Sequence, residues 1–138
     1  GRAADPGHVI IQTHHPQHPD LQCLLKDGYT AFAHQLLSAR HTNNLPPFCH
    51  HALLQCDAKT LQQAMKTLSL IAQHLKKQPC NLLGPTPSIK QKKKGRYHAS
   101  LTIQCSNKQQ RAQTLHYLAQ LNLKYAHYVV DVDPIQCL

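Results

Sequence analysis

One segment, residues 84–105, constrains the fold more than any other part of the chain. It reads GPTPSIKQKKKGRYHASLTIQC. Its second half alternates apolar and polar side chains, which predicts a β-strand with one buried face. The core face would carry Tyr97, Ala99, Leu101, Ile103 and Cys105, and the opposite face His98, Ser100, Thr102 and Gln104. Such a strand needs neighbouring strands and a packed core, so the chain must build a sheet.

The first half of this segment is a Gly/Pro turn followed by closely spaced cations. These are Lys90, Lys92, Lys93, Lys94 and Arg96. A loop anchored by a core strand would hold them in solvent, where they can neutralise phosphates without reading base sequence. The alternative is a solvated hairpin tip without a ligand. Tyr97, beside the cations, could stack on an unpaired base, although its place in the alternation also fits a half-buried core residue.

The charge balance points the same way. The chain has 15 Lys and Arg against six acidic residues, all Asp, and a formal net charge of +9. A field of this sign favours nucleic acid or another acidic partner, while solubility alone is the simpler explanation. A length of 138 residues accommodates one ordinary domain, or a small domain with an appended fragment.

The cysteines and histidines do not predict a metal site. The six cysteines are well separated, and no CxxC pair occurs. His14, His15 and His18 lie in a proline-rich turn, and His50 and His51 would point to opposite faces of a strand. No signal peptide or apolar run of 18 residues is present. We therefore expect a reduced, cytoplasmic protein with no metal and no membrane contact.

From Phe48 onward the pattern predicts an α+β domain of the ferredoxin-like βαββαβ type. Asp57 is the expected N-cap of the first helix, and Ser106-x-x-Gln109 is the expected capping box of the second. The expected elements are a strand at 48–56, a helix at 58–77, a short strand at 81–83, a strand at 97–105, a helix from 106 to about 122 and a strand at 125–133.

Residues 1–47 are predicted to form a separate part. It would contain a strand at 8–13 and two helices at about 19–26 and 29–41, interrupted near Gly28. Asn43-Asn44-Leu45-Pro46-Pro47 would end the second helix, because proline cannot continue it. The predicted division is therefore 1–47 and 48–138. The isolated strand suggests a piece of something larger.

Four strings together resemble a known family. They are GHVIIQTHHPQHPDLQCLLKDGYTAFAHQLLSAR, LPPF, LLGPTPSIKQKKKGRY and the terminal VVDVDPIQCL. They resemble the C-terminal end of the PriA family, the primosomal replication-restart DNA helicases (primosomal protein N-prime). The resemblance implies that residues 1–47 are the tail of the second helicase lobe, with 8–13 its last strand. Residues 48–138 would be the C-terminal DNA-binding domain.

The same resemblance implies that the motor lies outside this chain. Gly1-Arg2-Ala3 looks like the tail of the family's final helicase motif, so Arg2 would be a nucleotide-site remnant that is not functional alone. The chain has no GxxxxGK[ST] loop and no DEAH-type carboxylate pair. We expect a non-catalytic fragment without a cofactor, whereas the parent would be an ATP-dependent helicase that uses ATP with magnesium and holds structural zinc.

A second candidate site lies at the start of the helix after Cys105. Lys108, Arg111 and Gln113 project from its first turns, where free N–H groups favour anions. An acidic peptide with a free carboxylate would suit this site. The resemblance implies the acidic C-terminal tail of single-stranded DNA-binding protein as the ligand. The alternative is an ordinary exposed helix face.

These features predict a DNA-binding module that takes forked or single-stranded DNA without base specificity. Single-stranded DNA-binding protein and other primosome proteins would be its further partners. The competing hypothesis is a protein-interaction domain whose basic surface binds acidic partners only.

Overall fold

The structure is a computed structural model that describes residues 7–93, 95–121 and 127–135. The chain divides into two compact units, one ending at Thr42 and the other beginning at Asn43. The predicted division after Pro47 lies a few residues further along. Each unit is described by itself.

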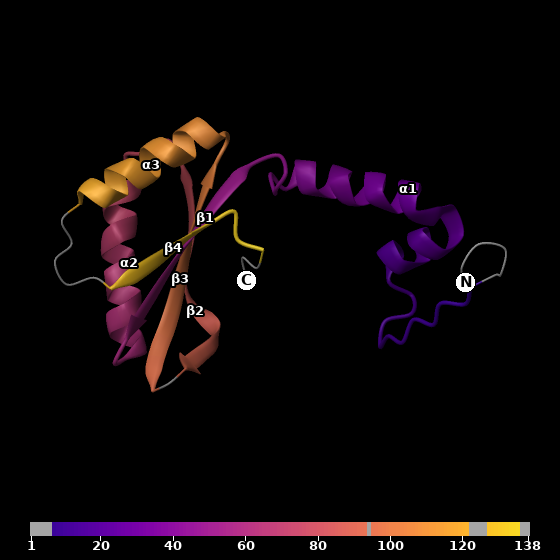
Figure 1. Cartoon of the computed structure of the whole chain (residues 1–138), viewed down its shortest axis with the longest axis horizontal. Coiled ribbons are helices and arrows are strands. Elements are labelled where there is room, and N and C mark those ends of the chain that lie inside the picture. The colour runs from indigo at the N-terminus through magenta and orange to yellow at the C-terminus, as the bar shows by residue number, and fades with distance from the viewer. Residues whose placement is uncertain (1–6, 94, 122–126, 136–138) are drawn as a thin grey trace. The chain divides into compact units, whose positions relative to one another are not determined.

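The first unit contains α1 (Pro19–Thr42), which consists of two helical segments joined across a kink at Gly28. Gly28 has φ 80° and ψ 177°, a conformation that a residue without a side chain adopts readily. The Gln35 amide donates to Asp20 Oδ1 at 3.2 Å and so links the two segments, which fold back on each other (Figure 1). The two predicted helices are confirmed. Within the described residues, no helix is both long and apolar enough to cross a membrane.

The predicted strand at residues 8–13 is wrong. These residues form no strand, and Val9 and Ile10 are almost fully exposed. A strand is stable only when a neighbour satisfies its backbone hydrogen bonds, and no described segment pairs with this one.

The second unit is a four-stranded antiparallel sheet with two helices on one face (Figure 1). The strand order is β2-β3-β1-β4. This arrangement confirms the predicted ferredoxin-like α+β fold. The elements in chain order are β1 (His50–Ala58), α2 (Leu61–Leu75), β2 (Asn81–Lys93), β3 (Arg96–Cys105), α3 (Lys108–Gln120) and β4 (Tyr128–Val132).

The core lies between the sheet and the two helices. The predicted core face of β3 is buried from Ala99 to Cys105, whereas Tyr97 at its start is half-buried. The facing side chains come from β1 and the helices and include Leu54, Leu68 and Ile71. The alternation of β3 therefore predicted the buried face correctly, and this packing anchors the strand that leads to the cations.

β2 is longer than the predicted strand at 81–83. It pairs with β3 from Asn81 to Lys93, with register shifts on both sides of the Thr86–Pro87 pairs. Gly84 has φ +108°, and a Cβ there would lie 3.1 Å from Ser100 O. The Gly/Pro segment is thus an irregularity within one strand. The cations consequently belong to the end of a β-hairpin, where Lys93 pairs with Arg96, and do not form a separate loop.

Both helices of this unit begin later than predicted. Asp57 belongs to β1 and is not an N-cap; Thr60 caps α2 instead. Asn107, and not Ser106, caps α3, and its side chain accepts from Gln110 N at 2.9 Å. These corrections matter for function because Asp57 is left free to contact other side chains.

Candidate nucleic-acid interface

The basic hairpin, residues 90–97, forms where β2 and β3 meet at their far end. Lys92 is opposite Tyr97 in the ladder, and its Nζ lies 5.4 Å from the centroid of the Tyr97 ring. Lys92 is exposed and Tyr97 half-buried. A lysine over an aromatic face is held by a cation–π attraction while its charge stays in solvent. Lys92 would have to move before a base could stack on that face of Tyr97.

The structure gives a strand position for two of the other predicted hairpin lysines and does not describe the third. Lys90 and Lys93 are positions in β2, and Lys94 lies outside the described residues. Arg2, the predicted nucleotide-site remnant, also lies outside them. The basic hairpin is therefore defined by its strand register and by the side chains of Lys92, Arg96 and Tyr97.

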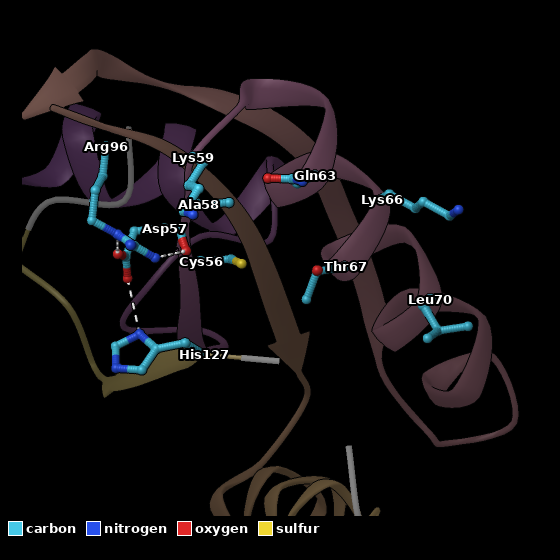
Figure 2. Close-up of a pocket in the computed structure, with 10 residues that line it drawn as sticks. All are labelled: Cys56, Asp57, Ala58, Lys59, Gln63, Lys66, Thr67, Leu70, Arg96 and His127. Atoms are coloured by element: carbon cyan, nitrogen blue, oxygen red, sulfur yellow. Dashed lines mark hydrogen bonds and ion pairs between the residues drawn. The ribbon is translucent and has the colours of Figure 1, made fainter. Parts of the chain in front are cut away.

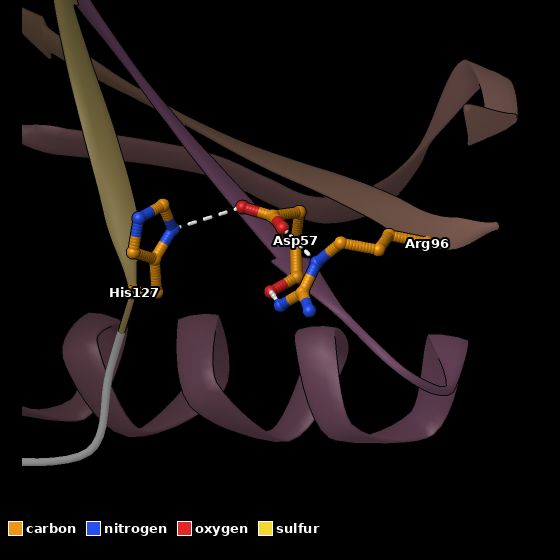
Figure 3. Close-up of polar contacts among 3 residues, drawn as sticks. All are labelled: Asp57, Arg96 and His127. Atoms are coloured by element: carbon orange, nitrogen blue, oxygen red, sulfur yellow. Dashed lines mark hydrogen bonds and ion pairs between the residues drawn. The ribbon is translucent and has the colours of Figure 1, made fainter. Parts of the chain in front are cut away.

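Arg96, the first residue of β3 after the hairpin turn, is held by Asp57. Its Nε donates to Asp57 Oδ2, and its Nη2 donates to the Asp57 backbone oxygen at 3.1 Å. His127 Nδ1 lies 2.9 Å from the other carboxylate oxygen of Asp57. Figure 3 shows the carboxylate lying between His127 and Arg96. The end of β1, the start of β3 and the residue just before β4, which are distant in the sequence, thus meet at the Asp57 carboxylate.

The environment of Asp57 keeps it ionised. Its partial burial alone would raise the pKa of the carboxyl group, but the hydrogen bonds from Arg96 and His127 outweigh this effect and hold the pKa below its ordinary value. Asp57 is therefore an internal anion next to the basic hairpin at neutral pH.

A shallow hollow surrounds this carboxylate, and we call it the Asp57 hollow. Figure 2 shows Arg96 and His127 beside Asp57, with Lys66 extending from α2 away from it. Its lining residues are Cys56, Asp57, Ala58, Lys59, Gln63, Lys66, Thr67, Leu70, Arg96 and His127. Sequence reasoning missed this site. The only local signal was that Lys59 and Lys66, seven residues apart, recur at a helical spacing.

The second candidate site is at the start of α3. Lys108 and Gln113 are exposed, whereas the Arg111 side chain is only 11% exposed. Arg111 Nη1 donates to Asp133 Oδ1 and to the His51 backbone oxygen at 3.3 Å. A peptide carboxylate that binds Arg111 would have to compete with Asp133.

A buried polar cluster lies at the same end of the sheet. The Cys49 thiol is 3.2 Å from His51 Nε2, and the Gln104 amide donates to Asn44 O at 2.7 Å. Burial lowers the pKa of His51, so this histidine is neutral at ordinary pH. Throughout the part of the chain that the structure describes, no group of three or more potential ligands is placed to hold a metal.

Comparison with known proteins identifies the class of this α+β domain. The family model described as "Primosomal protein N C-terminal domain" matches residues 41–135. The chain therefore belongs to the PriA C-terminal domain family.

Individual relatives agree with the family match. The chain is 36% identical to "Replication restart protein PriA" of Haemophilus influenzae, over 97% of the chain and 19% of that protein. Proteins of the same name from Synechocystis sp. and Bacillus subtilis are 28% and 29% identical, over 98% and 97% of the chain. The chain spans 17% and 18% of those two proteins, so it corresponds to less than a fifth of each relative.

Proposed function

We propose that this chain is the non-catalytic DNA-binding module of a replication restart protein. It would bind forked and single-stranded DNA through the basic hairpin, without base specificity. The observation that carries the proposal is the strand register that gathers cationic residues at the end of a hairpin whose other end is buried in the core. The net charge of +9 and the names of the relatives support it.

The chemistry of the hairpin suits a phosphate backbone. Lysine ammonium groups are mobile point charges that neutralise phosphates and release counterions, whichever bases are attached. Lys92 presents its ammonium group in solvent, and Tyr97 supplies an aromatic side chain beside it. Unpaired bases can stack on aromatic side chains in sequence-tolerant complexes. This combination favours a single strand or a fork over uniform duplex DNA.

The remaining parts of the proposal concern the parent and its partners. The parent would be an ATP-dependent DNA helicase that uses ATP with magnesium and holds structural zinc, and this chain would supply neither cofactor site. The acidic tail of single-stranded DNA-binding protein would bind at the start of α3, near Lys108, Arg111 and Gln113. Other primosome proteins would complete the assembly.

The test is fluorescence anisotropy with labelled forked DNA in low salt. We expect the triple variant K92A/K93A/K94A to bind roughly tenfold or more weakly than the native chain, because three phosphate contacts are lost. The matched control K26A/K76A/K77A removes the same charge at exposed positions elsewhere and should bind nearly as well as the native chain. Equal affinity of the two variants would contradict the proposal.

An acidic peptide in the same assay distinguishes the proposed DNA-binding function from the competing hypothesis, a protein-interaction domain that binds acidic partners only. If the hairpin variant loses affinity for the peptide but not for DNA, the surface is one for acidic proteins.

A further inference from the structure

The Asp57 hollow carries more positive charge than its single carboxylate can balance. Lys59, Lys66 and Arg96 are permanent cations, so together with the Asp57 carboxylate they give the lining a charge of +2. They come from the β1–α2 connection, α2 and β3, and His127 directly precedes β4. Permanent cations from three chain segments therefore line one hollow, with Lys59 and Arg96 near Asp57 and Lys66 extending away from it (Figure 2), and Asp57 is the only acidic residue in the lining.

Asp57 makes contacts with Arg96 and His127 of the kind that an external anion could make. Its carboxylate contacts Arg96 and His127 at the same time. Arginine offers five N–H donors in a planar fork that fits carboxylates and phosphates equally well. The Arg96 side chain is 47% exposed and that of His127 75% exposed, so both can reach an incoming ligand.

We propose that the Asp57 hollow is a second subsite for a DNA backbone phosphate, in which the phosphate displaces Asp57 from Arg96 and His127. The inference rests on the proposed DNA-binding function and deepens it. Arg96 belongs both to the basic hairpin and to the lining of the hollow, so one strand of DNA can pass from one to the other. Asp57 acts as the resident counter-ion that weakens this subsite until DNA arrives.

The lining favours a phosphate over an acidic peptide. Leu70 is the single large aliphatic side chain in it, so a peptide side chain would have only one large aliphatic residue to pack against. The lining also offers three permanent cations and the Gln63 amide, groups that bind phosphate oxygens without an apolar anchor.

The test measures the affinity for a labelled single-stranded oligothymidine. It compares one variant expected to bind more tightly and one expected to bind more weakly with a charge-matched control. Asp57→Asn removes the competitor for Arg96, so we expect roughly threefold tighter binding or more. The double variant K59A/K66A should bind several-fold more weakly, because it removes two exposed cations of the hollow. Asp131→Asn makes the same charge change at an exposed position outside the hollow and should alter the affinity less than twofold.

The outcomes separate the inference from the proposed function. If K92A/K93A/K94A weakens binding while Asp57→Asn matches Asp131→Asn and K59A/K66A matches the native chain, the hairpin function stands and the hollow is not a subsite. If no variant alters the affinity for DNA, both the proposed hairpin function and the phosphate subsite are contradicted. If Asp57→Asn is poorly folded by circular dichroism, K59A/K66A alone decides. If the hollow variants change binding of an acidic peptide and not of oligothymidine, the phosphate assignment is overturned.

Discussion

His51 is buried on β1 between the thiol of Cys49 and the amide of Gln104. Burial disfavours its charged form and lowers its pKa, whereas the nearby Asp133 carboxylate partly opposes this effect. Both neighbours contact the same ring nitrogen, Nε2, and the Gln104 amide nitrogen can only donate, so Nε2 has to be the unprotonated, accepting nitrogen of a neutral imidazole. Protonation of His51 at Nε2 would therefore remove the acceptor for the Gln104 amide.

This gives a pH prediction at the residue scale. The unfolded chain takes up a proton at His51 near pH 6.5, whereas the native chain resists until a lower pH. The unfolded state thus binds more protons in this window, and stability falls as the pH is lowered from 7.5 to 5.5. Urea unfolding at the two pH values should show a smaller loss for His51→Gln than for the native chain. The control His50→Gln should keep the full loss, and an undiminished loss in His51→Gln would contradict the assignment.

At the scale of elements, strand pairing decides where the helices begin. β1 continues to Ala58 because its ladder with β3 extends to the pair of Ala58 with Tyr97. Local capping preference had placed the helix start at Asp57, but backbone pairing to a strand about 40 residues away overrides it. A capping signal in the sequence indicates that a helix begins nearby, whereas long-range strand pairing determines the residue at which the helix begins.

The cap of α3 provides a direct check at this scale. The Asn107 side chain accepts from Gln110 N, so Asn107→Ala leaves a first-turn N–H without its partner. We expect a loss of about 1 kcal/mol in the free energy of unfolding. Ser106→Ala, at the position that the sequence pattern favoured, should cost clearly less. Urea unfolding of both variants measures the difference, and an equal or larger cost at Ser106 would show that the cap is misplaced.

For the whole molecule, the sequence predicted the α+β class, the buried face of β3 and the two segments of α1. Each depends on local periodicity, which one segment carries by itself. The strand at 8–13 failed because a strand depends on a partner. The Asp57 hollow was not predictable, since Lys59, Arg96 and His127 meet only after β1 has paired with both β3 and β4.

The same distinction applies to the basic hairpin. A run of cations beside an alternating strand is visible in the sequence, so the hairpin was found from it. The ion pair of Arg96 with Asp57 was not, because 39 residues separate the two. Local charge density thus indicates a candidate anion-binding surface, and the fold determines which of its cations already have an acidic partner.

The salt dependence of DNA binding is the sharpest test of whether the basic hairpin holds the DNA backbone. If four or five cations of the basic hairpin neutralise phosphates, the plot of log affinity against log salt should have a slope of about −3 to −4. In K92A/K93A/K94A the slope should be shallower by roughly 2 to 3, whereas K26A/K76A/K77A should keep the native slope. If the hairpin variant and the native chain have the same slope, the hairpin does not hold the DNA backbone and the account is contradicted.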